Sequence, residues 1–166
     1  RSWVAAVAAG LFVLALPKLM AWGAYGHGTK LGTFAWMPWA LWFTEALLRR
    51  GGTLWAVGLA VAFALMLLRA HVQIAYYAVI GVGALVLAHV PMDLRDPNLR
   101  RPALTRTGLV ALAGLVALGA ALFLYLPVLE YQDHSIRGAA SQGGGAALDY
   151  ATNWSLSWPE LPTLWW

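Results

Sequence analysis

Long apolar runs separated by short polar joints dominate the first 130 residues of the chain. A helix that spans a bilayer needs roughly 20 mostly apolar residues, and several runs approach that length. The runs are Trp3 to Trp22, Thr33 to Leu48, Thr53 to Leu68, Val72 to Val90, and Gly108 to Pro127. Because a backbone inside lipid can satisfy its hydrogen bonds only within a helix, each run is predicted to be helical. The pattern indicates an all-α, polytopic transmembrane helix bundle of about five spans, placed in residues 1–130.

The joint between the third and fourth runs is the least obvious boundary. The stretch Leu68-Arg69-Ala70-His71-Val72-Gln73 contains no Gly, Pro or Asn, which are the usual turn residues. One uninterrupted helix would however measure roughly 57 Å at 1.5 Å per residue, nearly twice the thickness of the hydrocarbon core. We therefore predict a tight hairpin at Arg69–Gln73. Pro17 and Pro38 lie inside the first two runs, where they are expected to kink the helices.

Residues 131–166 differ from the rest of the chain. Gly138 to Ala147 has no periodic apolar pattern, and it is predicted to be a glycine-rich loop. Ser157-Trp158-Pro159-Glu160 matches a capping box, which predicts a short helix that begins there. Trp154, Trp158, Trp165 and Trp166 suit the membrane interface. We expect residues 131–166 to form an extracytoplasmic loop and an interfacial short helix.

The composition supports an integral membrane protein. The chain is 61% hydrophobic and 11% charged, whereas globular proteins are about 45–50% apolar and about 25% charged. This composition excludes intrinsic disorder, and the absence of cysteine excludes disulfides and thiolate sites. The net charge of +4 is spread between apolar runs, so no nucleic-acid partner is expected. The apolar start after Arg1 and the apolar end at Trp166 led us to expect an internal piece of a larger protein, with the rest of that parent chain as a partner.

The arginines predict the orientation. With five crossings, seven of the 11 basic residues fall on one side, which should be cytoplasmic by the positive-inside rule. These seven are Arg1, Arg49, Arg50, Arg95, Arg100, Arg101 and Arg106.

Three polar clusters fall on the opposite side. They are Gly26-His27-Gly28-Thr29-Lys30, Arg69-Ala70-His71-Val72-Gln73, and Glu130-Tyr131-Gln132-Asp133-His134-Ser135-Ile136-Arg137. Cations and imidazoles gathered on one face suit an anionic group such as phosphate, because Lys and Arg bind it through charge-assisted hydrogen bonds. Each cluster also has a purely structural explanation: a glycine loop with a snorkelling lysine, a polar turn cap, and a solvated ion pair.

Cofactors and catalytic groups are less well defined by the sequence. No two histidines have i, i+3 or i, i+4 spacing, and His71 and His89 lie about 27 Å apart along one helix. We therefore expect no metal or haem cofactor, and we leave a requirement for a divalent metal open. Acid–base chemistry needs a positioned carboxylate or imidazole. The candidates, which the sequence does not rank, are His27, His71, Glu130, Asp133 and His134.

Several stretches resemble one known family. They are Tyr25-Gly26-His27-Gly28-Thr29-Lys30 with Ala35-Trp36-Met37-Pro38, Leu67 to Tyr77, Leu126-Pro127 through Glu130-Tyr131 to Ser135-Ile136-Arg137-Gly138, and Gly143-Gly144 to Leu148-Asp149-Tyr150-Ala151-Thr152-Asn153-Trp154-Ser155. In these stretches the chain resembles a central piece of the YfhO-type bacterial membrane protein family, large multispanning proteins grouped with GT-C glycosyltransferases. The motif His-x-Gln-Ile-x-Tyr-Tyr, together with the Gly-His-x-x-Lys loop, carries the resemblance.

The resemblance implies transfer of a sugar from a polyprenyl-phosphate donor to a cell-envelope acceptor, outside the cytoplasm of the bacterial inner membrane. The expected partners are membrane lipid and the polyprenyl-phosphate sugar. The positions that match the family motifs are His27, Lys30, His71, Gln73, Glu130, Ser135, Arg137 and Asp149. The resemblance further implies that the key acidic residue belongs to a large outer loop outside this chain.

These observations combine into one preferred prediction. His27, Lys30, His71, Gln73 and Arg137 are expected to bind the donor phosphate, and the supporting candidates are Arg69, Glu130, Asp133 and Asp149.

Two alternatives remain. A lipid or solute transporter, or a flippase, would place ionisable residues near the middle of the membrane on several helices. A non-catalytic structural membrane subunit would use the polar clusters only as helix caps, each pointing separately into solvent.

Overall fold

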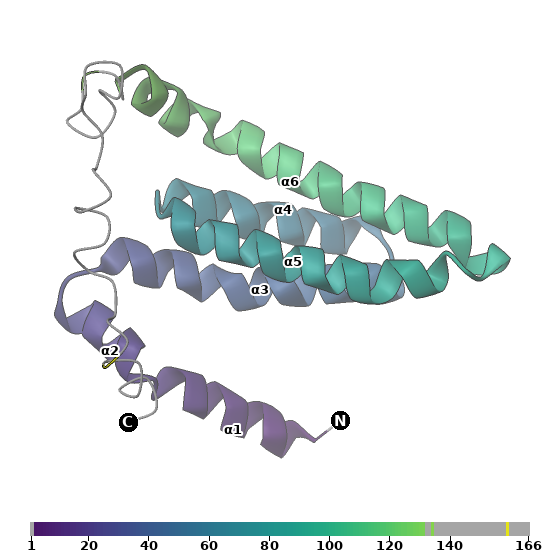
Figure 1. Cartoon of the computed structure of the whole chain (residues 1–166), viewed down its shortest axis with the longest axis horizontal. Helices are drawn as coiled ribbons and strands as arrows, with labels where there is room; N and C mark the ends of the chain where they lie inside the picture. The colour runs from purple at the N-terminus through teal and green to yellow at the C-terminus, as the bar shows by residue number, and fades with distance from the viewer. Residues whose placement is uncertain (1, 132–133, 135–158, 160–166) are drawn as a thin grey trace. The chain divides into compact units, whose positions relative to one another are not determined.

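The structure of the protein is a computed structural model that describes residues 2–131 together with His134 and Pro159. The chain divides into two compact units, Arg1–Leu122 and Phe123–Trp166. Within the described residues the regular structure is helical and contains no strand, which confirms the all-α prediction. The helices are α1 (Trp3–Leu14), α2 (Pro17–Ala24), α3 (Gly28–Arg50), α4 (Thr53–Leu68), α5 (Val72–Asp93) and α6 (Pro97–Tyr131) (Figure 1).

The first apolar run is broken where a kink was predicted. Helices α1 and α2 meet at an angle of 44° across Ala15 and Leu16. Pro17 occupies the first turn of α2, where its missing N–H costs nothing and its fixed φ favours helix initiation. Pro38, in contrast, lies inside α3, and that helix continues on both sides of it.

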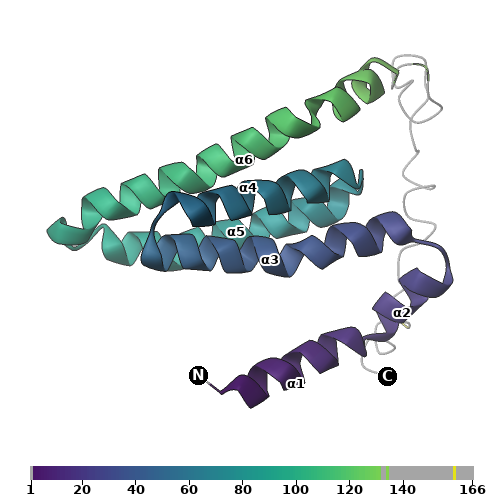
Figure 2. The same cartoon turned by 180° about the vertical axis from the view of Figure 1, so that it is seen from behind.

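Helices α3, α4 and α5 form the centre of the first unit. Figure 1 and its reverse view in Figure 2 both show them side by side. Gly51 and Gly52 join α3 to α4 with φ values of 69° and 102°, which glycine adopts without steric cost. Residues 69–71 join α4 to α5, so the predicted hairpin is confirmed, although Gln73 belongs to the first turn of α5. The core consists largely of small and aliphatic side chains, among them Leu47, Leu59 and Met66.

Helix α6 belongs to the first unit as far as Leu122. It buries the small side chains of Ala113 and Ala117, which permit close approach of apolar helices. Near its start, Arg106 Nη1 donates a hydrogen bond to the carbonyl oxygen of Leu48 on α3, at 2.9 Å. This bond satisfies one of the carbonyls that the end of a helix leaves without an intrahelical partner.

Two helices of the described chain, α5 and α6, are long and apolar enough to cross a membrane. The bent pair of α1 and α2 is a third candidate, and α4 is apolar but shorter, with 16 residues. These helices support a membrane protein. The five crossings expected from the sequence stay a prediction.

Successive helices from α3 to α6 run in alternating directions, so the first unit has two ends that carry different side chains. We call the end where α3 and α5 begin, next to His27 and His71, the histidine end. The opposite end, where α4 and α6 begin, is the arginine end, because Arg49, Arg50 and Arg106 lie there. The predicted glycine-rich loop and the predicted helix that begins at Ser157 lie outside the described residues.

Candidate functional site

A cavity of about 390 Å³ opens at the histidine end, between α2, α3 and the start of α5. We call it the lysine cavity. Its lining residues come from three stretches of the chain: Lys18 and Trp22; Lys30, Phe34 and Met37; and His71, Gln73, Ile74 and Tyr77. Cationic, hydrogen-bonding and apolar side chains therefore meet in one place.

Two lysines supply the positive charge. Lys18 follows Pro17 in the first turn of α2, and its Nζ lies 5.9 Å from the ring centroid of Trp22. Lys30 lies in the first turn of α3 and is half-buried. No carboxylate is among the lining residues, so neither ammonium group is neutralised by an acidic side chain of the cavity.

His71 is the N-cap residue of α5, but its side chain makes no capping hydrogen bond. Its Nδ1 atom is buried and has no hydrogen-bond partner among the described residues. A buried polar atom without a partner is costly. This nitrogen is therefore suited to a bound water or to a polar group of a ligand.

Gln73 and Tyr77 form a hydrogen-bonded pair along one face of α5. Gln73 Nε2 donates to Tyr77 Oη at 2.9 Å, across the i, i+4 spacing that brings helical side chains together. The amide oxygen and second N–H of Gln73 and the Tyr77 hydroxyl hydrogen are not used by this bond. The pair can therefore both accept from and donate to a hydroxylated ligand.

The remaining wall is apolar. The rings of Trp22 and Phe34 meet edge to face, with centroids 6.0 Å apart and an interplanar angle of 75°. Met37 and Ile74 complete this wall. A ligand that joins an anionic group to a hydrocarbon chain or to a sugar face would find complementary chemistry on the two sides of the cavity.

Helix termini also contribute partial charges at the histidine end. Helices α3 and α5 both begin there, and neither N-terminus has a side-chain cap. The first N–H groups of a helix lack intrahelical partners and carry a partial positive charge. The N-termini of α3 and α5 therefore add partial positive charge, whereas the C-termini of α2 and α4, which end on the same side, add partial negative charge.

The structure brings together Lys30, His71 and Gln73 of the five predicted phosphate-binding residues. His27 is at the same end of the first unit, but its side chain is exposed and does not line the cavity. Arg137 lies outside the described residues, as do the supporting candidates Asp133 and Asp149. The binding role of all five residues stays a prediction.

Two further candidates are placed differently. The Cδ and Nε atoms of Arg69 lie 3.1 Å from the point where Gly32 would carry a Cβ, so this side chain crosses α3 at a residue without a side chain. Glu130 is exposed near the end of α6 and belongs to the second unit. In that same unit the rings of Tyr131 and His134 are stacked, with centroids 6.0 Å apart.

The predicted phosphate-binding residues did not include Lys18 or Tyr77. Lys18 is noticeable in the sequence as an ionisable residue inside an apolar run, which by default suggests function. Tyr77 is identifiable by its i, i+4 relation to Gln73. The sequence does not show that Lys18 lies beside α3 and α5, because this position depends on the bend between α1 and α2.

Some ionisable residues of the arginine end are paired with one another. Glu45 contacts Arg49 on its own helix, and Glu45 Oε2 lies 2.8 Å from His89 Nε2 on α5. The described residues contain no group of three or more His, Asp or Glu side chains that could hold one metal ion. The lysine cavity brings two cationic side chains together, and its lining contains no carboxylate.

Comparison with known proteins gives no relative. No protein-family model matches the chain, and no curated protein or solved structure matches it.

Proposed function

We propose that the chain forms part of a GT-C-like membrane glycosyltransferase, which moves a sugar from a polyprenyl-phosphate donor to a cell-envelope acceptor. In this proposal the lysine cavity holds the phosphate of the donor. The single observation that supports it is the meeting of Lys18, Lys30 and His71 in one cavity with an apolar wall and no carboxylate. The motif resemblance supplies the reaction class.

The proposed chemistry uses the charge that develops on the leaving group. An acceptor hydroxyl attacks the anomeric carbon, a new carbon–oxygen bond forms with inversion, and the bond from that carbon to the phosphate oxygen breaks. The lysine ammonium groups and the N-termini of α3 and α5 stabilise the phosphate as it leaves. Gln73 and Tyr77 bind sugar hydroxyls. The base that takes the hydroxyl proton is not assigned to a described residue.

The proposed topology places the cavity outside the cytoplasm of a bacterial inner membrane. Five crossings, with α1 and α2 counted as one broken span, leave the arginine end in the cytoplasm. The histidine end then faces the extracytoplasmic side, where polyprenyl-linked sugars would be used. Two sequence-distant motifs that share one cavity favour a binding site over separate helix caps, although His27 is exposed and lies outside that cavity.

Direct binding of polyprenyl phosphate tests the phosphate site. We expect Lys30→Ala and Lys18→Ala each to raise the Kd of the purified chain for polyprenyl phosphate roughly ten- to a hundredfold, because a hydrogen bond to a charged group contributes about 1.5–3 kcal/mol. Arg95→Ala removes the same charge from the arginine end and should leave this Kd unchanged. Wild-type affinity in both lysine variants would remove the lysine cavity from the mechanism.

Sugar transfer in membranes that contain the full-length protein tests the activity. His71→Ala should reduce the rate, because it removes an imidazole whose buried Nδ1 lies at the cavity. A protein that moves lipid or solute across reconstituted vesicles without any sugar transfer would instead be a transporter or flippase.

A further inference from the structure

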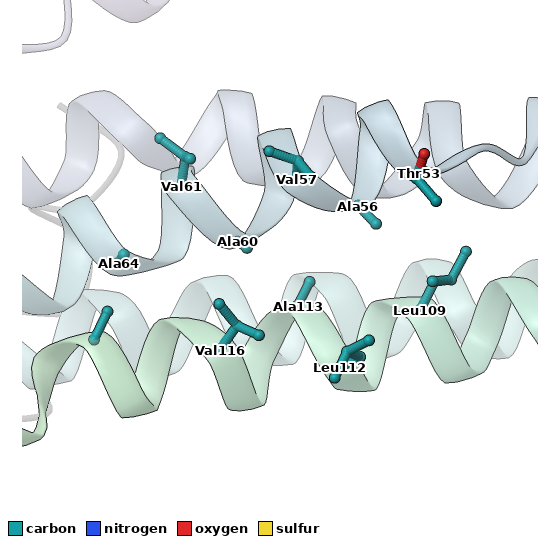
Figure 3. A pocket seen from close by; sticks show the side chains of 11 residues that line it. Thr53, Ala56, Val57, Ala60, Val61, Ala64, Leu109, Leu112, Ala113 and Val116 are labelled. Carbon is teal, nitrogen blue, oxygen red and sulfur yellow. The ribbon is translucent and has the colours of Figure 1, made fainter.

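A second cavity, entirely separate from the lysine cavity, lies between α4 and α6. It has a volume of about 390 Å³ and is a groove with short side chains along its floor. Figure 3 shows Ala56, Ala60 and Ala64 of α4 opposite Ala113 and Val116 of α6. Thr53, at one end, is the polar residue of a lining that is otherwise aliphatic.

The length of this groove corresponds to one leaflet of a bilayer. It extends along α4 from Thr53 to Ala64 and along α6 from Leu109 to Ala120. Each stretch rises roughly 16 Å at 1.5 Å per residue. That is about half of a hydrocarbon core of roughly 30 Å. The groove therefore accommodates an acyl chain of the leaflet at the arginine end.

The arginine end, where the groove opens, carries an excess of positive charge. Arg106 lies one turn before Leu109 on α6, and only its Nη1 donates to the Leu48 carbonyl oxygen. A guanidinium carries five N–H donors in total, so Arg106 retains donors for an anion. Six arginines lie in the helix ends and links of this end against three carboxylates: Arg49, Arg50, Arg95, Arg100, Arg101 and Arg106 against Glu45, Asp93 and Asp96.

We propose that this groove binds an anionic glycerophospholipid, with one acyl chain between α4 and α6 and the phosphate against Arg106 and the Thr53 hydroxyl. Basic pockets between transmembrane helices are suited to anionic headgroups. A second copy of the chain could cover small residues equally well, but an aliphatic helix would not balance the charge at the mouth. The proposal is independent of the transferase function, since the lysine cavity lies at the opposite end.

Lipid binding to the purified chain in detergent tests this proposal. Dioleoylphosphatidylglycerol and neutral dioleoylphosphatidylcholine are titrated separately, and bound lipid is counted by native mass spectrometry. We expect tighter binding of phosphatidylglycerol, and Arg106→Gln should raise its Kd about fivefold. The matched control Arg95→Gln removes one arginine from the same end, away from the groove lining, and should change that Kd by less than about twofold.

A second variant tests the contribution of the groove to lipid binding without changing any charge. Ala60→Phe fills the groove and should abolish specific binding of phosphatidylglycerol, whereas Ala84→Phe, on the exposed surface of α5, should preserve it. If Arg106→Gln fails to fold, the Ala60→Phe and Ala84→Phe pair decides the question alone. Equal affinity for the two lipids, or unchanged binding in Ala60→Phe, would overturn the proposal. So would a dimer of the chain that Ala60→Phe dissociates.

Discussion

Ala70 reverses the chain direction between α4 and α5 with a φ of 56°. A non-glycine residue in this left-handed region carries a steric cost of roughly 1–2 kcal/mol. The neighbouring helices hold it there, because α4 and α5 both pack against α3. The turn exists although its own sequence does not favour one.

Ala70→Gly should therefore stabilise the protein by about 0.5–1 kcal/mol, since the relief of strain exceeds the larger unfolded-state entropy of glycine. Ala88→Gly is the control, because Ala88 is exposed inside α5 and should lose about 1 kcal/mol. Thermal unfolding in detergent micelles measures both changes. A shift of the same sign in both variants would contradict the assigned backbone conformation.

The pair formed by Gln73 and Tyr77 makes a prediction that rests on the proposed function. Tyr77→Phe removes the hydroxyl that accepts from Gln73, so the Kd for a polyprenyl-phosphate sugar should rise several-fold. The Kd for sugar-free polyprenyl phosphate should not change, because the lysines bind the phosphate. Equal effects on both ligands would remove these residues from sugar binding.

Some of the candidate site was predictable from the sequence. The cluster from Arg69 to Gln73 and the loop that contains Lys30 were identified by their charges, and three of their residues line the lysine cavity. Lys18 was not assigned, because its position depends on the 44° bend before α2. A bend angle depends on packing, which local sequence does not specify.

At the scale of elements, the contact between α3 and α4 depends on one glycine. A Cβ on Gly58 would lie 2.5 Å from Cε1 of Phe43. The Phe43 ring has little freedom to move away, because Trp39, Trp42 and Trp55 surround it at centroid distances of 6.2, 5.0 and 6.5 Å. Close helix approach at Gly58 is therefore coupled to this aromatic cluster.

Gly58→Ala should destabilise the protein by about 1–3 kcal/mol, because the added methyl group overpacks the contact. Gly83→Ala is the matched control in α5, where nothing lies within 4 Å of a new Cβ, and it should stabilise the helix by up to about 1 kcal/mol. In a Phe43→Ala background the penalty of Gly58→Ala should largely disappear. Chemical denaturation of the four variants measures this coupling.

The helix bounds show which helix ends an apolar run predicts correctly and which it does not. The apolar run Thr53–Leu68 matches the bounds of α4. The charged residue Arg69 follows this run directly, so the end of the run coincides with the end of the helix. Helix α6 begins at Pro97, well before the apolar run that starts at Gly108. Its polar first turns contain good helix formers, which apolarity alone does not detect.

At the scale of the molecule, the lysines Lys18 and Lys30 lie at one end of the first unit and most of the arginines lie at the other. The hypothesis of a shared anion site required His27 and His71 to lie at the same end, and they occupy the N-cap positions of α3 and α5, which begin side by side. This arrangement was predictable because successive helices alternate in direction. The number of membrane crossings was not, because α3 carries charges at both ends and α4 is short.

Cysteine labelling tests which end of the first unit faces the cytoplasm. The sequence contains no native cysteine, so only the introduced cysteine can react. Tyr25→Cys and Asn98→Cys both replace exposed residues, at the histidine end and after the start of α6 respectively. In intact cells a membrane-impermeant maleimide should label position 25 and not position 98. Labelling of both positions from outside would contradict the proposed topology.

The break at Ala15 and Leu16 bears on how an amphiphilic ligand would reach the lysine cavity. Helix α2 carries Lys18 and Trp22, contacts α3, and is joined to its neighbours by short links at both ends. Among the helices that line the cavity α2 is the shortest, so an outward displacement of α2 would break less packing than a displacement of α3 or α5. A long-chain substrate could then enter sideways from the bilayer, headgroup first, without threading its tail through an aqueous opening.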